Sequence, residues 1–265
     1  MAQNRGILTK MEVENNTEVQ YALNLDHQKI ELNPLIGKNI KLEFLHEIHC
    51  LNCGSLTKKS YAQGYCYPCF ISIPETDECI LHPEKCEAHL GISRDMEWSK
   101  NHCLQEHYVY LAVSSGLKVG VTRMSQIPTR WIDQGAQKAI RLAKTPNRHL
   151  AGLIEVSLKK HMADKTNWRN MLINKIDEIN LLTSKKTAIE NLDRNFHTYI
   201  DIDDEIFEFN YPVLQYPQKV KSINLDKEFN IEKKLTGIKG QYLIFEDDYV
   251  INIRKYGGYK VLFEY

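Results

Sequence analysis

The cysteine residues are the part of the sequence with the clearest capacity for chemistry. The chain holds two Cys-x-x-Cys pairs that are separated by 12 residues: Cys50, Cys53, Cys66 and Cys69. A two-residue gap lets both thiolates of a tight turn reach one ion at ~2.3 Å, and two such turns complete a tetrahedral zinc site. Gly54 and Gly64 lie beside the pairs and supply the backbone freedom that such turns need. We therefore predict a closed, structural zinc site, with four unrelated buried thiols as the alternative.

A second group of metal-ligating residue types follows between positions 79 and 107. Its members are Cys79, His82, Cys86, His89, His102, Cys103 and His107. The pair at positions 86 and 89 and the pair at 103 and 107 are each spaced to chelate, and together they would form a two-cysteine, two-histidine zinc site. Cys79, His82 and His102 compete for a place in it. The alternative is a set of histidines on solvated loops around packed cysteines.

The number of cysteines and the hydrophobicity of the sequence indicate the cellular compartment of the protein. Seven is an odd number, and in a reducing compartment cysteines serve as thiolate ligands or free thiols more often than as disulfides. No apolar run approaches the ~20 residues of a membrane helix, and the first residues lack the apolar core of a signal peptide. We therefore expect a cytoplasmic protein with no membrane partner and no organic cofactor.

Hydrophobic periodicity predicts the elements that must position these residues. Alternating runs between residues 7 and 44 predict antiparallel strands, whereas residues 46–107 have the weak periodicity of a metal-stapled module. The centre of the chain predicts strand, strand, helix, strand and helix, at residues 108–113, 117–122, 127–135, 139–143 and 150–162. Residues 168–182 continue a helical pattern, and alternation returns between residues 211 and 265.

These patterns predict an α+β fold in four parts. The parts are N-terminal β strands (1–45), an inserted zinc-ribbon-type module (46–107), an α/β domain with following helices (108–186) and a C-terminal β-rich region (187–265). The N-terminal and C-terminal strands are expected to combine, with a small β-barrel as one way of closing them.

Residues 108–162 resemble the GIY-YIG nuclease domain, in particular its small single-domain branch. The residues that carry the resemblance are Tyr110, Gly120, Arg130 and Glu155. In that family tyrosines help to activate water, the arginine stabilises developing phosphate charge, and the glutamate holds a divalent metal such as Mg²⁺ or Mn²⁺. The resemblance implies an α/β domain of this kind, with a catalytic site formed by Tyr110, Lys118, Arg130 and Glu155.

Lys118 is a departure from the family pattern because it stands where the second tyrosine is expected. A lysine stabilises a phosphate, but when it is protonated near pH 7 it is a poor general base. Tyr110 also has an ordinary interpretation as a strand residue, and Arg130 as a helix-surface residue. Glu155 lies at the margin of an apolar face, where a carboxylate needs a basic residue or a metal as its partner. The sequence leaves both binding and cleavage open.

The formal charge of zero conceals a segregated distribution. Basic and acidic side chains number 10 and 15 in residues 1–107, 11 and 3 in residues 108–170, and 13 and 16 in residues 171–265. The central stretch therefore carries a net charge of +8, which is typical of a phosphate-tracking surface if several of its residues share a face. Our candidates for nucleic-acid binding are Lys118, Arg123, Arg130, Lys138, Arg141 and Arg148. A solvated surface without a partner is the alternative.

Nearly the whole chain is also similar to the family filed as domain of unknown function number 2797. The similarity rests on segments such as Cys-x-x-Cys-Gly, Leu-Ala-Val-Ser-Ser-Gly-Leu-Lys-Val-Gly-Val-Thr-Arg and Pro-Thr-Arg-Trp-Ile-Asp-Gln-Gly-Ala. Three hypotheses follow. The first is a zinc-stabilised protein that binds nucleic acid, preferably RNA, through a degenerate GIY-YIG-like site. The second is an active metal-dependent phosphodiesterase or endonuclease, and the third a scaffold or translation-associated protein that docks an acidic partner.

Overall fold

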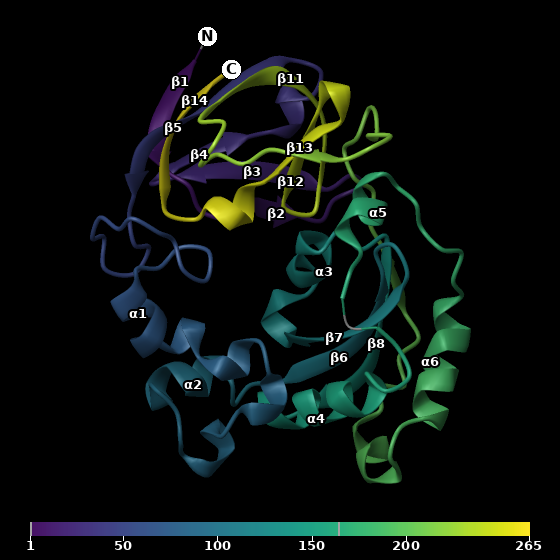
Figure 1. Ribbon diagram of the computed structural model, residues 1–265. Helices are drawn as coiled ribbons and strands as arrows, with labels where there is room; N and C mark the ends of the chain where they lie inside the picture. The colour runs from purple at the N-terminus through teal and green to yellow at the C-terminus, as the bar shows by residue number, and fades with distance from the viewer. Residues whose placement is uncertain (1, 164) are drawn as a thin grey trace. The chain divides into compact units, whose positions relative to one another are not determined.

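The computed structural model describes residues 2–163 and 165–265, which form a mixed α+β structure. The chain divides into two compact units. Unit 1 is made of residues 1–71, 172–174 and 210–265, and unit 2 of residues 72–171 and 175–209. Figure 1 shows the purple N-terminal and yellow C-terminal parts of the chain interleaved within unit 1.

Unit 1 is built on a seven-stranded sheet that joins the two ends of the chain. In spatial order its strands are β1 (Gln3–Ile7), β14 (Tyr259–Glu264), β5 (Asn39–Ile48), β11 (Asn230–Lys239), β12 (Tyr242–Phe245), β13 (Tyr249–Asn252) and β10 (Lys221–Ser222). All neighbours are antiparallel except β10 and β13. A separate three-stranded sheet contains β2 (Glu12–Glu14), β3 (Gln20–Leu25) and β4 (Gln28–Glu31).

The expected pairing of N-terminal with C-terminal strands is confirmed, but the barrel is not. Alternation along β5 buries Ile40, Leu42 and Phe44 on one face, because successive side chains of a strand point to opposite faces. Among the described residues the edge strands β1 and β10 do not pair with each other, so the sheet stays open. β10 is only two residues long, which leaves too few backbone groups to close a barrel.

Unit 2 is built on a four-stranded antiparallel sheet. Its spatial order is β7 (Leu117–Arg123), β6 (His107–Val113), β8 (Lys138–Thr145) and β9 (Ile206–Glu208). The predicted hairpin and third strand are confirmed, and the hairpin register places Tyr110 opposite Gly120. Every residue of the central strand β6 is buried, which explains its unbroken apolar pattern.

Two helices pack their apolar stripes on this sheet. The core combines strand residues such as Val109 and Leu111 with Ile154 and Leu158 of α4 (Arg148–Leu158) and with Ala188 of α6 (Leu181–Glu190). The other helices of the chain are α1 (Tyr67–Ser72), α2 (Met96–His102), α3 (Thr129–Asp133) and α5 (Trp168–Leu172). No helix in the described part of the chain is both long and apolar enough to cross a membrane.

The helical pattern predicted for residues 168–182 is wrong over its middle. α5 ends at Leu172, and Asn174 then adopts a positive φ of 56°, which a right-handed helix does not allow. Asn180 starts α6 by accepting a hydrogen bond from the Thr183 backbone nitrogen, a side-chain cap that marks a new helix. The turn at Asn174 and the cap at Asn180 therefore divide the segment into two helices, although its apolar periodicity is continuous.

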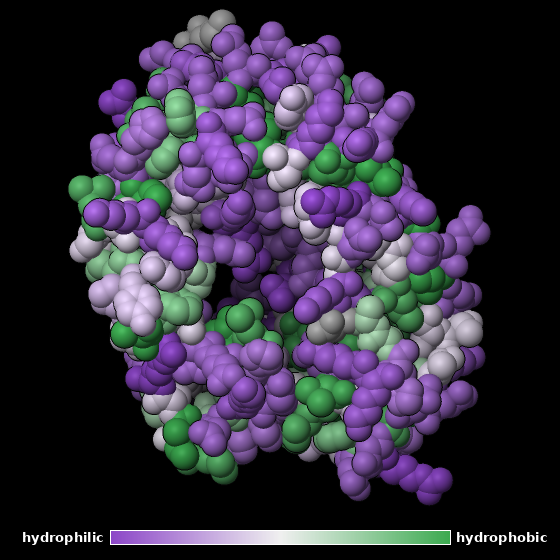
Figure 2. Space-filling view, viewed as in Figure 1, coloured by the Kyte–Doolittle hydropathy of each residue, from purple (hydrophilic) through white to green (hydrophobic). Residues whose placement is uncertain are grey.

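The visible surface is mostly hydrophilic. Figure 2 shows apolar residues in small scattered groups among polar ones on the face that it presents. Such groups are ordinary for a folded chain and do not form a broad apolar patch on that face.

Candidate functional site

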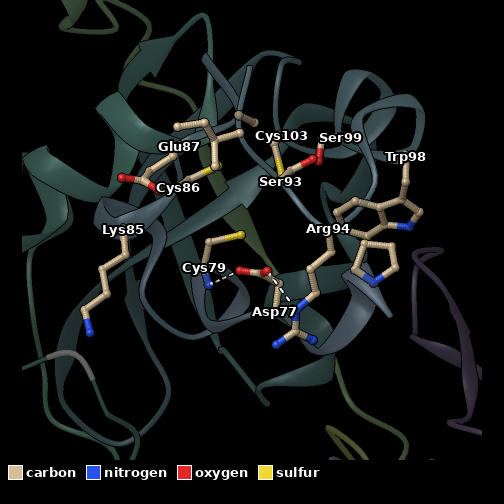
Figure 3. A pocket seen from close by; sticks show the side chains of 13 residues that line it. Asp77, Cys79, Lys85, Cys86, Glu87, Ser93, Arg94, Trp98, Ser99 and Cys103 are labelled. Atoms are coloured by element: carbon tan, nitrogen blue, oxygen red, sulfur yellow. Dashed lines mark hydrogen bonds and ion pairs between the residues drawn. The ribbon is translucent and has the colours of Figure 1, made fainter. Parts of the chain in front are cut away.

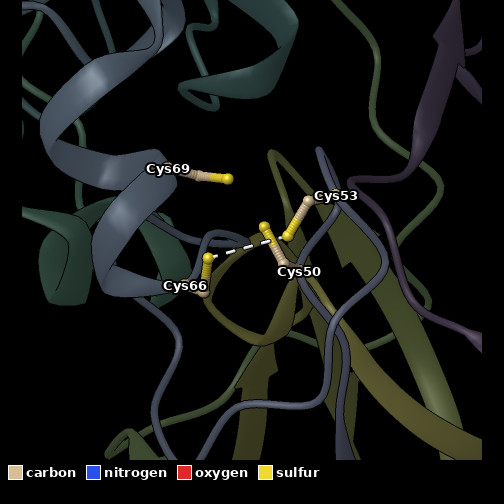
Figure 4. Close-up of side chains that lie close together, drawn as sticks. All are labelled: Cys50, Cys53, Cys66 and Cys69. Carbon is tan, nitrogen blue, oxygen red and sulfur yellow. Dashed lines mark hydrogen bonds between the residues drawn. The ribbon is translucent and has the colours of Figure 1, made fainter.

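The four cysteines of unit 1 converge on one point. The Sγ atoms of Cys50, Cys53, Cys66 and Cys69 all lie within 4.8 Å of one another. The sulfurs of Cys53 and Cys66 are 3.7 Å apart, close to the ~3.8 Å edge of a tetrahedron with ~2.3 Å zinc–sulfur bonds. Figure 4 shows the four side chains turned toward a common centre. The four-cysteine group thus fits a zinc ion, and a closed set of thiolates leaves no position for catalysis.

Local backbone structure holds this group in place. The backbone nitrogen of Cys50 donates to the oxygen of Ser55, and the nitrogen of Gly54 to the oxygen of Cys50, which closes the first turn. Gly54 and Gly64 have positive φ values of +72° and +155°, which agrees with the backbone freedom expected of glycine beside these turns. Hydrogen bonds from Ser55 lower the pKa of the Cys53 thiol to about 6, so this ligand is a thiolate at neutral pH.

A three-cysteine group lies in unit 2. The Sγ atoms of Cys79, Cys86 and Cys103 are within 4.8 Å of one another and all three residues are buried. Hydrogen bonds from the Cys79 and Cys86 thiols lower the pKa of Cys103 to about 2, and the charge of Arg148 acts in the same direction. One negative charge is thus favoured on Cys103, whereas hydrogen bonding with the neighbouring thiols raises the pKa of Cys79 and Cys86.

The predicted histidine ligands are not gathered with these thiols. The His89 ring stacks on the His149 ring, with centroids 4.3 Å apart. His107 is buried, its Nδ1 lies 2.7 Å from the Gln105 oxygen, and its Nε2 has no hydrogen-bond partner. Among the described residues neither histidine has a ring nitrogen within 4.8 Å of all three sulfurs. The structure thus brings Cys79 into the second group and keeps His89 and His107 outside it.

Two residues of helix α4 contact the segment that holds the three-cysteine group: the cation Arg148 and the closely packed Gly152. Arg148, at its first residue, is buried and donates from Nη1 to the Cys79 oxygen at 3.2 Å and from Nη2 to the His102 oxygen at 3.3 Å. One turn later, a Cβ on Gly152 would lie 2.1 Å from the Glu84 backbone nitrogen. Only a glycine lets the loop before Cys86 pack this closely on α4.

The four residues implied by the nuclease resemblance lie close together in unit 2, Tyr110 and Lys118 on strands β6 and β7, Arg130 on α3 and Glu155 on α4. The Tyr110 hydroxyl donates to Gln134 Oε1 at 3.1 Å, and Lys118 Nζ donates to the same oxygen. Burial raises the pKa of Tyr110, while the charge of Arg130 acts on the same hydroxyl in the opposite direction and that of Glu155 adds to the rise. We call Tyr110, Lys118, Arg130, Gln134 and Glu155 the polar cluster.

Close packing and ion pairing hold the polar cluster. A Cβ on Gly120 would lie 2.6 Å from the Tyr110 hydroxyl oxygen, so the glycine makes room for the tyrosine side chain. Glu155 is 8% exposed, and its carboxylate is 3.3 Å from Lys159 Nζ, one turn along α4. Glu155 therefore has the basic partner that its position demands.

The family described as protein of unknown function (DUF2797) matches residues 37–261. The chain belongs to this family. Both cysteine groups and the whole polar cluster fall inside the matched part of this DUF2797 protein. No curated protein and no solved structure matches it.

The predicted nucleic-acid-binding residues of this DUF2797 protein already have intramolecular partners. Lys118 contacts Gln134, Lys138 donates to the Ile179 oxygen, and Arg123 Nη1 lies 3.5 Å from the Asn101 oxygen. Arg148 is buried beside the thiols. Arg141 is paired with an acidic segment, through Asp201 at 3.4 Å, Asp203, and Glu205 at 3.3 Å. Arg130 is half-buried beside Tyr110.

Two parts of the site in this DUF2797 protein escaped sequence reasoning. Gln134 is the shared acceptor of the polar cluster, but the resemblance assigns no role to this residue, which lies just after a short helix. Arg148 is predicted from sequence as a nucleic-acid-binding residue, but it is the first residue of α4, after the Asn147 cap, and is buried beside Cys79. Neither position has a spacing rule comparable to that of the cysteine pairs.

Proposed function

We propose that this chain is a zinc-stabilised nucleic-acid-binding protein whose polar cluster holds a phosphodiester of single-stranded RNA. The observation that carries the proposal is the convergence of residues from two strands and two helices of unit 2 around Tyr110 and its hydrogen-bond acceptor Gln134. A resemblance between dispersed motifs predicted that these residues act together, and packing alone gives no reason for five polar side chains to gather there.

The chemistry of the polar cluster suits a phosphate oxygen. Lys118 and Arg130 supply positive charge, and the Tyr110 hydroxyl supplies a further donor. In this proposal an incoming phosphate oxygen replaces Gln134 Oε1 as the acceptor for Tyr110 and Lys118. Glu155 would hold Mg²⁺ or Mn²⁺ after exchanging Lys159 for the ion.

The strand order also supports the resemblance to the GIY-YIG domain. The sheet has the first strand of the hairpin at its centre, with the second strand and the third strand on its two sides. The short helix α3 and the longer helix α4 follow in the expected order along the chain. The likeness is one of arrangement, and it supports a shared site geometry more than a shared activity.

Binding without cleavage is favoured by the protonation of the cluster. Burial raises the pKa of Tyr110, so its hydroxyl stays protonated at neutral pH and donates. Lys118 replaces the second tyrosine with a group that also donates. Of the residues that the resemblance implies, Glu155 alone offers a proton acceptor, and it is paired with Lys159. Of the two tyrosines of the family pattern, one is therefore held protonated in this chain and the other is replaced by a lysine.

An aromatic and basic surface beside the four-cysteine group supports a single-stranded ligand. Tyr61 stacks on Phe70 with centroids 5.6 Å apart, and Lys59 Nζ lies 5.0 Å above the Tyr61 ring. Tyr67 is 54% exposed next to Tyr61. Exposed aromatic rings with nearby cations are the usual stacking platforms for unpaired bases. Lys58 and Lys59 also line a pocket of about 530 Å³ over this surface.

Fluorescence anisotropy with labelled single-stranded and structured RNA, and with DNA of the same sequences, tests the proposal. We expect single-stranded RNA to bind, with affinity that falls steeply as salt rises. Arg130→Gln should weaken binding about tenfold through loss of a charged phosphate contact. Tyr67→Ala should weaken it by a comparable factor, because base stacking contributes ~1–3 kcal/mol.

The matched control is Lys186→Gln, which removes one positive charge from an exposed position of α6 in unit 2. Its affinity should stay within about twofold of wild type. Absence of salt-sensitive binding to every RNA and DNA at low salt would refute nucleic-acid binding. An equal loss of RNA affinity in Arg130→Gln and Lys186→Gln would mean that binding depends on overall positive charge, and the polar cluster would then have no specific role.

Cleavage is tested on the same nucleic acids with Mg²⁺ or Mn²⁺. We expect intact substrate after prolonged incubation. Cleavage that disappears in Glu155→Gln would instead establish the metal-dependent phosphodiesterase, whereas cleavage that persists in Glu155→Gln points to a contaminating nuclease.

A further inference from the structure

The three-cysteine group of unit 2 is not a closed metal site. Cys79 comes from the 3₁₀ helix Glu78–Ile80, Cys86 follows the 3₁₀ helix Pro83–Lys85, and Cys103 follows α2. Three elements thus direct three sulfurs to one point within 4.8 Å, which is a built ligand set and not a chance pair. Within the described residues, no fourth histidine, cysteine, aspartate or glutamate reaches the same point.

A pocket borders the three-cysteine group. Its volume is about 330 Å³, and it is lined by all three cysteines together with Asp77, Arg94, Trp98 and Ser99. Figure 3 shows the three sulfur atoms at the pocket wall and the Asp77–Arg94 ion pair beside them. The Arg94 Nε to Asp77 Oδ2 distance is 3.1 Å, so these two charges are largely mutually satisfied.

The buried charge beside the three-cysteine group also fits three thiolates and one divalent ion. Three thiolates around Zn²⁺ carry a net charge of −1, which is costly to bury without a partner. Arg148 supplies one positive charge beside Cys79 and Cys103, and its Nη atoms are held by two backbone oxygens. A fourth thiolate from outside the chain would raise the charge to −2, with the added charge on the pocket side of the ion and not in the protein interior.

We propose that Cys79, Cys86 and Cys103 bind one zinc ion whose fourth coordination position faces the pocket and takes a monodentate donor from outside the chain. The donor is water at rest, and a low-molecular-weight thiol displaces it as thiolate, with its proton passing to solvent. A pocket of this size admits a small thiol, and the Trp98 ring offers an apolar wall for its carbon atoms. The site differs in this respect from the closed four-cysteine group.

Cadmium NMR on the full chain tests the proposal, because cadmium replaces zinc and its chemical shift reports the number of bound sulfurs. We expect two signals, one typical of four sulfurs and one typical of three sulfurs with a lighter donor. Addition of 2-mercaptoethanol should move the second signal toward the four-sulfur position and leave the first unchanged. Cys86→Ser should remove the second signal alone, and native mass spectrometry should show the loss of one of two zinc ions.

His89→Gln and His107→Gln decide between an outside donor and a histidine of the chain. We expect both variants to keep both signals at their wild-type positions. A shift of the second signal in His107→Gln would overturn the open position, because it would make Nε2 of His107 the fourth ligand. One bound metal per wild-type chain, or a second signal that 2-mercaptoethanol does not move, would also overturn the proposal. None of these outcomes depends on nucleic-acid binding.

Discussion

Gly120 determines where the Tyr110 ring lies in the polar cluster. The two residues are paired across the β6–β7 hairpin, and the tyrosine hydroxyl passes over the glycine Cα, where a Cβ would be 2.6 Å away. The aromatic ring also contacts Trp131 edge-on at a centroid distance of 5.7 Å, so it has little freedom to withdraw. This single position therefore couples strand pairing to the donor geometry of the site.

Gly120→Ala is expected to lower the free energy of unfolding by about 1–3 kcal/mol, because the added methyl group overpacks a buried contact. Urea denaturation followed by tyrosine and tryptophan fluorescence measures the change. Gly116→Ala, in the turn of the same hairpin, is the control: its Cβ would meet only Asp177 Oδ2, the end of a flexible side chain, at 3.0 Å. Equal effects at the two positions would contradict a specific role for Gly120.

His107 makes unit 2 sensitive to acid. Burial lowers the pKa of this histidine to about 4 in the folded chain, against about 6.5 when unfolded. As pH falls from 6.5 toward 4, the unfolded chain therefore takes up a proton that the folded chain does not. Folding stability is lost over this window, by up to roughly 3 kcal/mol, and is fully present above pH 6.5.

The pH dependence can be checked by urea denaturation of wild type and His107→Gln between pH 7.5 and pH 4. The decline should be shallower in His107→Gln, since the variant has no imidazole to titrate. His161→Gln, at an exposed position of unit 2, should follow the wild-type curve. Parallel curves for all three proteins would show that His107 does not contribute, and metal release common to all three cancels from the comparison.

At the scale of elements, helix α4 links the sheet of unit 2 to its three-cysteine group. Its buried stripe includes Ala151 and Ile154 in the core, while Arg148 lies against Cys79 and Gly152 against Glu84. Alanine normally stabilises a helix interior by about 1 kcal/mol relative to glycine. Here the Cβ would be 2.1 Å from a backbone nitrogen, so the contact outweighs the propensity.

Gly152→Ala is accordingly expected to displace the loop before Cys86 and to release the metal of the three-cysteine group, while the four-cysteine group in unit 1 keeps its ion. Native mass spectrometry should show a fall of one bound zinc per chain. Ser157→Ala on the same helix is the control and should retain both ions. Retention of both ions in Gly152→Ala would mean that the loop can shift without moving Cys86.

The sequence predicted the longer helices and strands and the paired cysteines, but not the positions of the histidines or the shortest edge strand. The hairpin, β8 and α4 were predicted closely because their apolar periodicities match real buried faces. The Cys-x-x-Cys pairs were gathered as expected because chelate spacing is local. The histidines were not, since whether His89 meets a thiol or His149 depends on contacts between segments about 60 residues apart. Edge strand β9 is three residues long, too short for a periodic signal.

For the molecule as a whole, the segregated charge of the sequence is partly cancelled by folding. The acidic segment after α6 turns back on the basic stretch, where Arg141 meets Asp201, Asp203 and Glu205, and on α6 itself, where Lys185 meets Asp204 at 2.9 Å. Linear charge counts could not show this, because they contain no information about which segments become neighbours. The excess of +8 therefore overstates the charge that unit 2 offers to a phosphate backbone.

Neutralising the acidic segment should expose that charge. The triple variant Asp201→Asn, Asp203→Asn, Glu205→Gln frees Arg141, and we expect tighter RNA binding with a steeper salt dependence, by about 0.7 in the logarithmic slope for one added phosphate contact. Fluorescence anisotropy across a salt series measures both quantities. The ion pairs are partly exposed, so the loss in stability should stay within about 1 kcal/mol per pair.

A charge-matched triple variant of unit 1, Glu14→Gln, Glu31→Gln, Glu228→Gln, removes three exposed carboxylates and has the same net charge. An equal gain in affinity for both triple variants would mean that net charge alone governs binding, and the acidic segment would lose its specific role.

The sheet of unit 1 has a consequence for the order in which the chain is made. β14 lies between β1 and β5, and the Ala2 and Tyr265 backbones exchange two hydrogen bonds, so the first strand depends on the last (Figure 1). During translation, all segments of unit 2 have been synthesised once residue 209 is added, because this unit lies within residues 72–209. The early strands of unit 1 must wait for residue 264 before their sheet is complete. Unit 2 can therefore fold before the C-terminal strands of unit 1 have been synthesised, whereas the sheet of unit 1 needs those strands.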